Sequence, residues 1–224
     1  MLSASDRKVI TAAVPGIDVS HYQPAIDWAA VVGAGFQYCF IKATEGVACV
    51  DRSFAQHWQN ARDAGLIRGA YHFFRPALTV ESQADFFLGI VKELQPGDLP
   101  PVLDLEAPQD WTPLPAGERA ALAVSWLQTV ERQLGVTPIV YVSPAFATGI
   151  LGNSSDLVRY PVWVAHYTTA EAPSVPKPWT SWTFWQHSNG RALGLPVPVD
   201  LNRFNGSRDN LKELTVPSTP HTSS

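Results

Sequence analysis

The stretch Pro100-Pro101-Val102-Leu103-Asp104-Leu105-Glu106 decides the fold and points to the chemistry. It predicts a buried β-strand that ends in two carboxylates. Because side chains two residues apart in a strand share a face, Asp104 and Glu106 are expected side by side, with the two leucines on the opposite face. Adjacent carboxylates in a water-poor site repel each other, so one of them keeps its proton near neutral pH. A carboxylic acid beside a carboxylate is a common catalytic pair in enzymes that hydrolyse glycosidic bonds.

The same pair has a structural alternative, in which it caps a loop or binds a cation. The choice depends on which other groups the fold brings to the same place.

Composition limits the answer before any other motif is weighed. The chain has 224 residues, of which 46% are hydrophobic and 11% aromatic, so it can bury one large core of the size usual for a single α/β barrel. Its formal net charge of −4 and pI near 5.8 argue against nucleic acid as a partner, because phosphate binding needs a basic face. We therefore expect one catalytic domain that acts as a monomer.

The ends of the chain and its cysteines carry no sign of export or cross-linking. The first sixteen residues lack the apolar core of a signal peptide, and no segment is apolar enough for a membrane span, so synthesis in the cytoplasm is expected. Cys39 lies in an apolar strand and Cys49 in the following loop, which indicates one buried and one incidental thiol. Residues 1–13 form a polar lead-in, residues 14–215 the catalytic barrel, and residues 216–224 a disordered tail rich in Ser, Thr and Pro.

Apolar runs alternate with helical stretches along the chain, which favours a parallel α/β architecture. Eight strands are expected, at 14–20, 36–43, 68–74, 102–106, 138–142, 162–167, 181–187 and 198–201. Helical periodicity follows each of the first five strands, at 26–34, 54–64, 80–94, 117–134 and 145–151. The later links are short and rich in Pro, Gly, Ser and Thr. The fold class is therefore α/β, an irregular TIM-like barrel of five β/α units followed by three loop-connected strands.

If this barrel closes, two further acids lie at the same end of it as Asp104 and Glu106. We call this end of the barrel the mouth. Active sites of such barrels lie at the carboxyl ends of the strands, where Asp104 and Glu106 end the fourth strand and Asp18 lies near the end of the first. Asp200 belongs to the eighth strand, which becomes the neighbour of the first on closure. Four acids crowded at one mouth are costly for a structural site and useful for a catalytic one.

Aromatic residues give the mouth a second property. Strand parity places several rings on the inner face, where they suit the faces of sugars, although each could equally fill the core. The candidates for substrate binding are Tyr71, Phe73, Tyr141, Trp163 and Tyr167, with Gln186 and Asn202 as hydrogen-bonding groups.

Metal chemistry has little support in the sequence. The six histidines show no spacing typical of a zinc site, and no Gly-rich phosphate loop follows a strand, so no metal or other cofactor is expected. His72 alternates with Tyr71 and Phe73 and is expected to face the helices as a core residue. Lys42 and Glu45 are expected to form an ion pair that orders the loop after the second strand.

Seven motifs together resemble glycoside hydrolase family 25, the Ch-type lysozymes. They are GIDVSHYQ (16–23), IKATEG (41–46), GAYHFFRP (69–76), PVLDLE (101–106), VWVAHY (162–167), WQHSNG (185–190) and VDLNRFNG (199–206). Their order and span, about residues 14–206, make the resemblance far more specific than any one of them. It implies N-acetylmuramidase activity, the cleavage of the β-1,4 bond between N-acetylmuramic acid and N-acetylglucosamine in peptidoglycan. It also implies a barrel of five β/α units plus three strands.

The resemblance implies a role for each acid. Glu106 matches the proton donor of the family. Asp104 either acts on the anomeric carbon or orients the substrate's own N-acetyl group for attack, and the second role suits a carboxylate on the same strand as the acid. Asp18 and Asp200 would tune the pKa of this pair and hold hydroxyls or water.

Two other functions fit parts of the same pattern. A carbohydrate-binding barrel without turnover would keep the aromatic residues, and it would bind peptidoglycan without releasing reducing ends. A metal-dependent barrel hydrolase would use the acids to hold Mg²⁺ or Ca²⁺, and a chelator would stop it. A muramidase without an export signal or a wall-binding repeat fits a phage-type endolysin or an effector delivered by a secretion machine.

Overall fold

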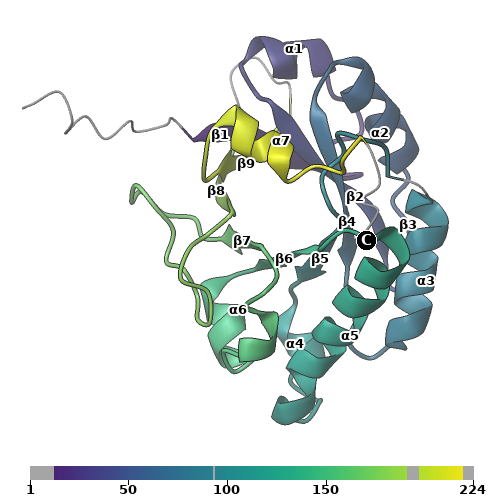
Figure 1. The fold of residues 1–224 in the computed structure, drawn as a ribbon, viewed down its shortest axis with the longest axis vertical. Helices are drawn as coiled ribbons and strands as arrows, with labels where there is room; N and C mark the ends of the chain where they lie inside the picture. The colour runs from purple at the N-terminus through teal and green to yellow at the C-terminus, as the bar shows by residue number, and fades with distance from the viewer. Residues whose placement is uncertain (1–12, 93, 191–196, 219–224) are drawn as a thin grey trace, which may run out of the picture.

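A closed ring of β-strands forms the centre of the computed structural model, which describes residues 13–218 except 93 and 191–196. The expected lead-in and most of the expected tail lie outside the described residues. The barrel strands are β1 (Val14–Val19), β2 (Tyr38–Glu45), β4 (Ile67–Phe73), β5 (Val102–Leu105), β6 (Ile139–Val142), β7 (Val162–Ala165), β8 (Phe184–Gly190) and β9 (Val199–Phe204). β1 pairs with both β2 and β9, which closes the ring (Figure 1). A two-residue strand, β3 (Cys49–Val50), pairs with β2 outside the ring.

Helices cover the outside of the first five strands. They are α1 (Trp28–Gly33), α2 (Phe54–Asp63), α3 (Val80–Val91), α4 (Pro108–Trp111), α5 (Ala116–Leu134) and α6 (Pro144–Gly149). A 3₁₀ turn, η1 (Ser155–Leu157), precedes β7, and α7 (Arg208–Glu213) follows β9. The expected five β/α units and three following strands are confirmed. Figure 1 shows helices along one side of the ring and loops along the side of β7 and β8.

The direction of the last strand differs from the expected parallel barrel. β9 is antiparallel to both β8 and β1, while every other neighbouring pair in the ring is parallel. An antiparallel strand starts where its neighbours end. Asp200, the second residue of β9, therefore still lies at the carboxyl ends of the other strands, although it stands near the start of its own.

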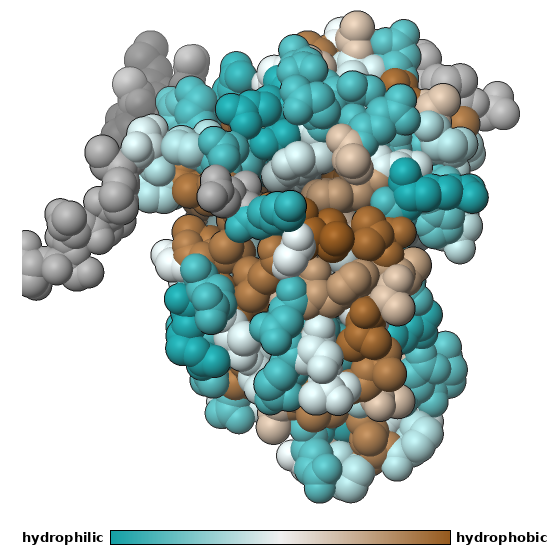
Figure 2. Space-filling view, turned by 90° about the vertical axis from the view of Figure 1, so that its right-hand side faces the viewer, coloured by the Kyte–Doolittle hydropathy of each residue, from teal (hydrophilic) through white to brown (hydrophobic). Residues whose placement is uncertain are grey.

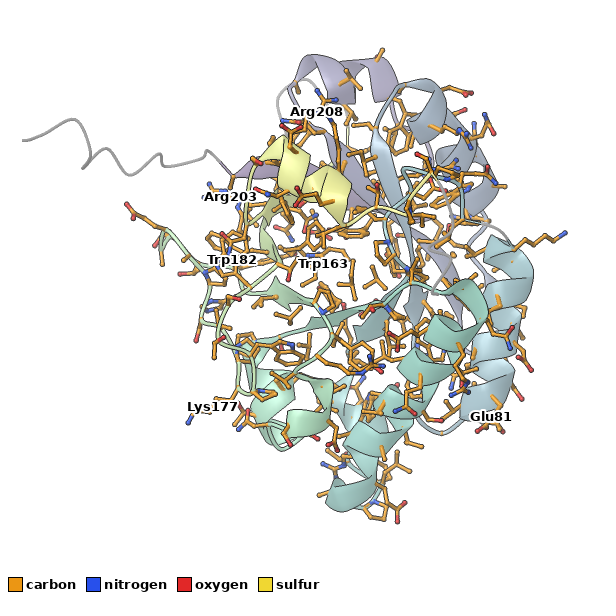
Figure 3. All side chains as sticks on the ribbon, viewed as in Figure 1. Glu81, Trp163, Lys177, Trp182, Arg203 and Arg208 are labelled. Carbon is orange, nitrogen blue, oxygen red and sulfur yellow. The ribbon has the colours of Figure 1, made fainter. Side chains whose placement is uncertain are left out.

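Side-chain parity divides the core into two layers. Outward residues of the strands, such as Leu103 and Leu105, pack against the helices. Inward residues are mostly aromatic, and they fill the barrel below the mouth with Tyr38, Phe40, Trp163, Phe184 and Phe204. Trp163 lies inside the ring in Figure 3, whereas Trp182 and Arg203 lie at its edge. Leu211 of α7 packs into the same inner cluster, so the last helix closes the end of the barrel opposite the acids.

Helix α5 illustrates how the sequence produces the outer layer. Its buried residues recur at helical spacing, Ala120, Ala123, Trp126, Leu127 and Val130, and they give it one apolar face against the barrel. Gly135 ends the helix with φ of 69°, a left-handed conformation that glycine adopts without steric cost.

The surface is mixed in character. Figure 2 shows apolar residues gathered across the middle of one face, between hydrophilic regions above and below. None of the described helices combines the length and the apolar character that a membrane crossing would need. Both cysteines are free, Cys39 buried and Cys49 exposed, as expected.

Candidate active site

A cavity of about 840 Å³ opens at the carboxyl ends of the parallel strands. All four predicted acids line it: Asp18 from β1, Asp104 and Glu106 from the end of β5, and Asp200 from β9. The fold therefore brings together groups that are up to 182 positions apart (200 − 18).

The β5 wall carries two carboxyls in different surroundings. Asp104 is 5% exposed and lies in register between Phe73 of β4 and Tyr141 of β6. Glu106 follows the last residue of the strand and is exposed to the cavity. Ala107 then takes a left-handed conformation (φ 54°, ψ 67°) that turns the chain sharply into α4. The indole N–H of Trp111 donates to the Glu106 carbonyl oxygen at 3.0 Å and fixes this turn.

The pKa values of Asp104 and Glu106 are both raised, and each carboxyl affects the pKa of the other. Burial is the largest cause for both, and the neighbouring Glu106 charge raises the pKa of Asp104 further. The Oδ1 atom of Asp104 is buried and has no hydrogen-bond partner among the described residues. A bare carboxylate oxygen is costly in such a place, whereas a proton on the pair satisfies it. Of the two carboxyls, Asp104 is the more deeply buried.

Asp18 is held from behind by two side-chain amides. Its Oδ2 atom accepts from Asn202 Nδ2 at 2.7 Å and from Gln186 Nε2 at 3.0 Å. Trp163 Nε1 donates to Asn202 Oδ1 at 2.8 Å, and Tyr141 donates its hydroxyl proton to Gln186 Oε1 at 2.8 Å. Because the indole nitrogen can only donate, the Asn202 oxygen must face Trp163 and its NH₂ group must face Asp18.

The pKa of Asp18 is raised to about 7, mainly by burial and then by the nearby Asp200 charge, against the opposing effect of the two amides. The two residues are direct partners across the β1–β9 ladder. Asp200 is half-buried, accepts the Tyr167 hydroxyl at 2.8 Å, and also has a raised pKa because of burial. Crowding of acids at one mouth, expected from the sequence, is therefore present.

The predicted sugar-binding residues divide into two groups. Six line the cavity: Tyr71, Phe73, Tyr141, Trp163, Tyr167 and Gln186. Asn202 is 1% exposed and lies behind Asp18, so its position suits a residue that orients the acid.

Several lining residues were not among the predicted site residues. Lys42 and Glu45 form the expected ion pair at 2.6 Å, but Lys42 also reaches the cavity. Tyr22, 77% exposed on the loop after β1, stands at the rim. Phe146 and Ile150 add an apolar wall near α6. Lys42 lies two residues after Phe40 and four after Tyr38, so the alternation of side chains along the strand could have placed it on the inner face. Loop residues have no such periodicity.

None of the described residues that line the cavity is a histidine. His72 is buried outside the ring, where it contacts Thr44 and Gln83 and stacks on Trp126, as expected for a core residue. Over the described part of the chain, no group of three or more His, Cys, Asp or Glu side chains could hold a metal ion.

Comparison with known proteins identifies the family. Residues 17–194 match the family model described as glycosyl hydrolases family 25. The chain belongs to glycoside hydrolase family 25. This family 25 hydrolase is 37% identical over 213 residues to Lysozyme M1 of Streptomyces globisporus, and the match covers 91% of this chain and 72% of that protein. It is 36% identical to the N,O-diacetylmuramidase of Chalaropsis sp, covering 91% and 99%.

A solved structure agrees with the sequence comparison. The bacterial lysozyme of Streptomyces coelicolor superposes with a TM-score of 0.87 at 35% identity, and the match covers 93% of this chain and all of that one. The family 25 hydrolase is thus a glycosidase with an irregular α/β barrel, as the sequence motifs indicate.

Proposed function

We propose that the protein is an N-acetylmuramidase that hydrolyses the β-1,4 bond between N-acetylmuramic acid and N-acetylglucosamine in peptidoglycan. The observation that carries the proposal is the pair of carboxyls at the end of β5, both with raised pKa, in a cavity lined with aromatic rings. Relatives named as a lysozyme and an N,O-diacetylmuramidase support the substrate class.

Glu106 is the general acid in this proposal, and its exposure explains how it obtains the proton. In the free site water solvates Glu106, so Asp104 holds the shared proton. A sugar that fills the cavity removes this water, and desolvation raises the pKa of Glu106. The proton then moves to Glu106, which donates it to the oxygen of the departing sugar as the glycosidic bond breaks.

Asp104, now ionised, accepts the N–H of the substrate's acetamido group. This contact orients the acetamido oxygen toward the anomeric carbon, where it replaces the departing oxygen, and water later opens the cyclic intermediate. Asp104 and Glu106 line the same side of the cavity, at the end of β5, and this favours orientation of the substrate over direct attack from the opposite side. Asp18 and Asp200 lie across the mouth and hold hydroxyls or water.

The substitution Glu106→Gln tests the assignment of the acid. We expect turnover of purified peptidoglycan to fall by about 10²–10⁴-fold, because general acid catalysis contributes about that much. Released reducing ends, identified by mass spectrometry as muramic acid, measure it. Wild-type turnover in this variant would overturn the assignment, and binding of peptidoglycan by the wild-type protein without reducing ends would favour the carbohydrate-binding alternative.

Peptidoglycan from which the N-acetyl groups have been removed tests substrate assistance. It lacks the acetamido oxygen and should resist cleavage, while re-acetylation should restore it. Cleavage of both forms at one rate would contradict the role proposed for Asp104.

We further propose that the protein acts as a monomer on the cell wall after synthesis in the cytoplasm, as a phage-type endolysin or a delivered effector. Genes beside its own would distinguish these settings, since a membrane-permeabilising partner accompanies the first and a secretion apparatus the second.

A further inference from the structure

Four carboxyl residues line the cavity, and Lys42 is the one cationic side chain among its described lining residues. Lys42 shares the inner face of β2 with Tyr38 and Phe40, at the level of the mouth. Its residue is 8% exposed, so its charge acts in surroundings poor in water. Electrostatic effects are stronger there than at the surface.

Contacts hold the ammonium group of Lys42 in one place. Its Nζ atom lies 2.6 Å from Glu45 Oε2 and 4.8 Å from the centre of the Phe73 ring. Glu45 Oε1 accepts two bonds from Arg75, whose Nη1 reaches Asp110 Oδ2 at 2.5 Å. Arg75 thereby neutralises much of the Glu45 charge and ties β2 to the turn that follows Glu106.

The charged and titratable groups around Lys42 come from several elements. Tyr71 of β4 is its partner in the ladder, His72 lies behind the sheet, and Asp18 of β1 lines the same cavity. On the β5 side, Lys42 lowers the pKa of both Asp104 and Glu106, against the raising effect of burial. The two acids at the end of β5 therefore experience the positive charge of Lys42.

We propose that Lys42, anchored by Glu45, is a positioning residue that keeps a single proton on the Asp104–Glu106 pair at neutral pH. The proposal rests on the function proposed above. With two protons on the pair, no carboxylate is left to orient the acetamido group. With no proton on the pair, neither carboxyl can protonate the oxygen of the leaving sugar. A fixed cation disfavours the doubly protonated state, which the crowded acids would otherwise favour.

Two substitutions with opposite expected effects test this proposal. Lys42→Met removes the cation, so both apparent pKa values of the pair rise and the bell-shaped profile of kcat/KM moves about one unit to higher pH. Glu45→Gln keeps an acceptor for Lys42 but removes the anion, so the profile moves to lower pH. Lys42→Arg keeps the charge and should restore the wild-type position of the profile.

Lys212→Met is the matched control, because Lys212 also pairs with an acid three residues away but lies on α7, beyond the opposite end of the barrel. Its profile should match that of the wild type. Loss of rate in both site variants without movement of the profile, or movement in the same direction, would overturn the proposal. If Lys42→Met does not fold, the direction of the Glu45→Gln shift still decides. Wild-type protein that releases no reducing ends would instead refute the proposed function.

Discussion

Asp18 is subject to opposing influences at the scale of a single residue. Two amide N–H groups stabilise its ionised form, while burial and the Asp200 charge stabilise its neutral form. Its pKa of about 7 in the folded protein lies well above its ordinary value of 3.8. Below about pH 4 the group is neutral in both folded and unfolded chains, so it has no effect on stability there. As pH rises toward 7 the unfolded state ionises first, and stability falls.

The substitution Asp18→Asn should relieve this cost. Its amide oxygen can still accept from Asn202 and Gln186, but it carries no charge. We expect the variant to melt at a higher temperature than the wild type at pH 7–8, by roughly 2–4 °C per kcal/mol relieved, and to lose the advantage near pH 4. Hydrolysis should fall, because the site loses an acid.

Thermal melting across this pH range measures the effect. Asp85→Asn, on an exposed position of α3, is the control and should change little at any pH. A melting difference for Asp18→Asn that stays constant with pH would show that charge is not its cause.

At the scale of elements, two glycines show how the aromatic interior is accommodated. A Cβ atom on Gly16 of β1 would lie 2.3–2.5 Å from ring atoms of Tyr38, and one on Gly69 of β4 would lie 2.7 Å from Phe40. At such distances the added Cβ atom and the ring would have to move apart. The rings cannot move freely, because Tyr38 and Phe40 also pack against Phe184 inside the closed barrel.

We therefore expect Gly16→Ala to lower the free energy of unfolding by about 1–3 kcal/mol through overpacking. Gly33→Ala is the matched control, since no atom lies within 4 Å of its added Cβ on α1, and a gain of roughly 0.5–1 kcal/mol is expected. Urea unfolding of both variants measures the difference. Equal stability of the two would contradict the packing of the inner layer.

The sequence predicted elements well where periodicity was long enough to detect. Five helices and eight barrel strands appear near their expected positions. The structure adds α4, α7 and β3, which span four, six and two residues and are too short to show a period. The direction of β9 was also missed, because alternation of side chains is the same in parallel and antiparallel strands.

The candidate site could also be predicted in part from the alternation of side chains along the strands. Strand ends and parity placed the four acids and most of the rings at one mouth. They could not show that Gln186 and Asn202 bind Asp18, because those contacts depend on the register among β1, β8 and β9. The reach of Lys42 into the cavity depends likewise on the closure of the ring.

At the scale of the whole molecule, we propose that the protein acts as a monomer. Specific activity on soluble peptidoglycan fragments should therefore not change with protein concentration over a wide range. Light scattering after gel filtration is expected to give a mass near 24.5 kDa, the mass of one chain. Activity that rises with association would show that a second copy completes the site.

A chelator provides another test of the whole protein. The proposed mechanism uses carboxyl groups and the substrate's own acetamido group and no metal ion, so EDTA should leave the rate unchanged at constant ionic strength. Inhibition by EDTA that added Mg²⁺ or Ca²⁺ reverses would support the metal-dependent alternative.

The reversed course of β9 has a practical consequence for attaching this protein to other materials. β1 begins at the end of the barrel opposite the acids, and β9 runs toward that same end, where Val216 bonds to the backbone of Gly97 and Asp98. The folded chain thus begins and ends at the end of the barrel that is opposite the acids. A bead, resin or partner module joined at either side of residues 14–216 would leave the opening unobstructed for an insoluble polymer.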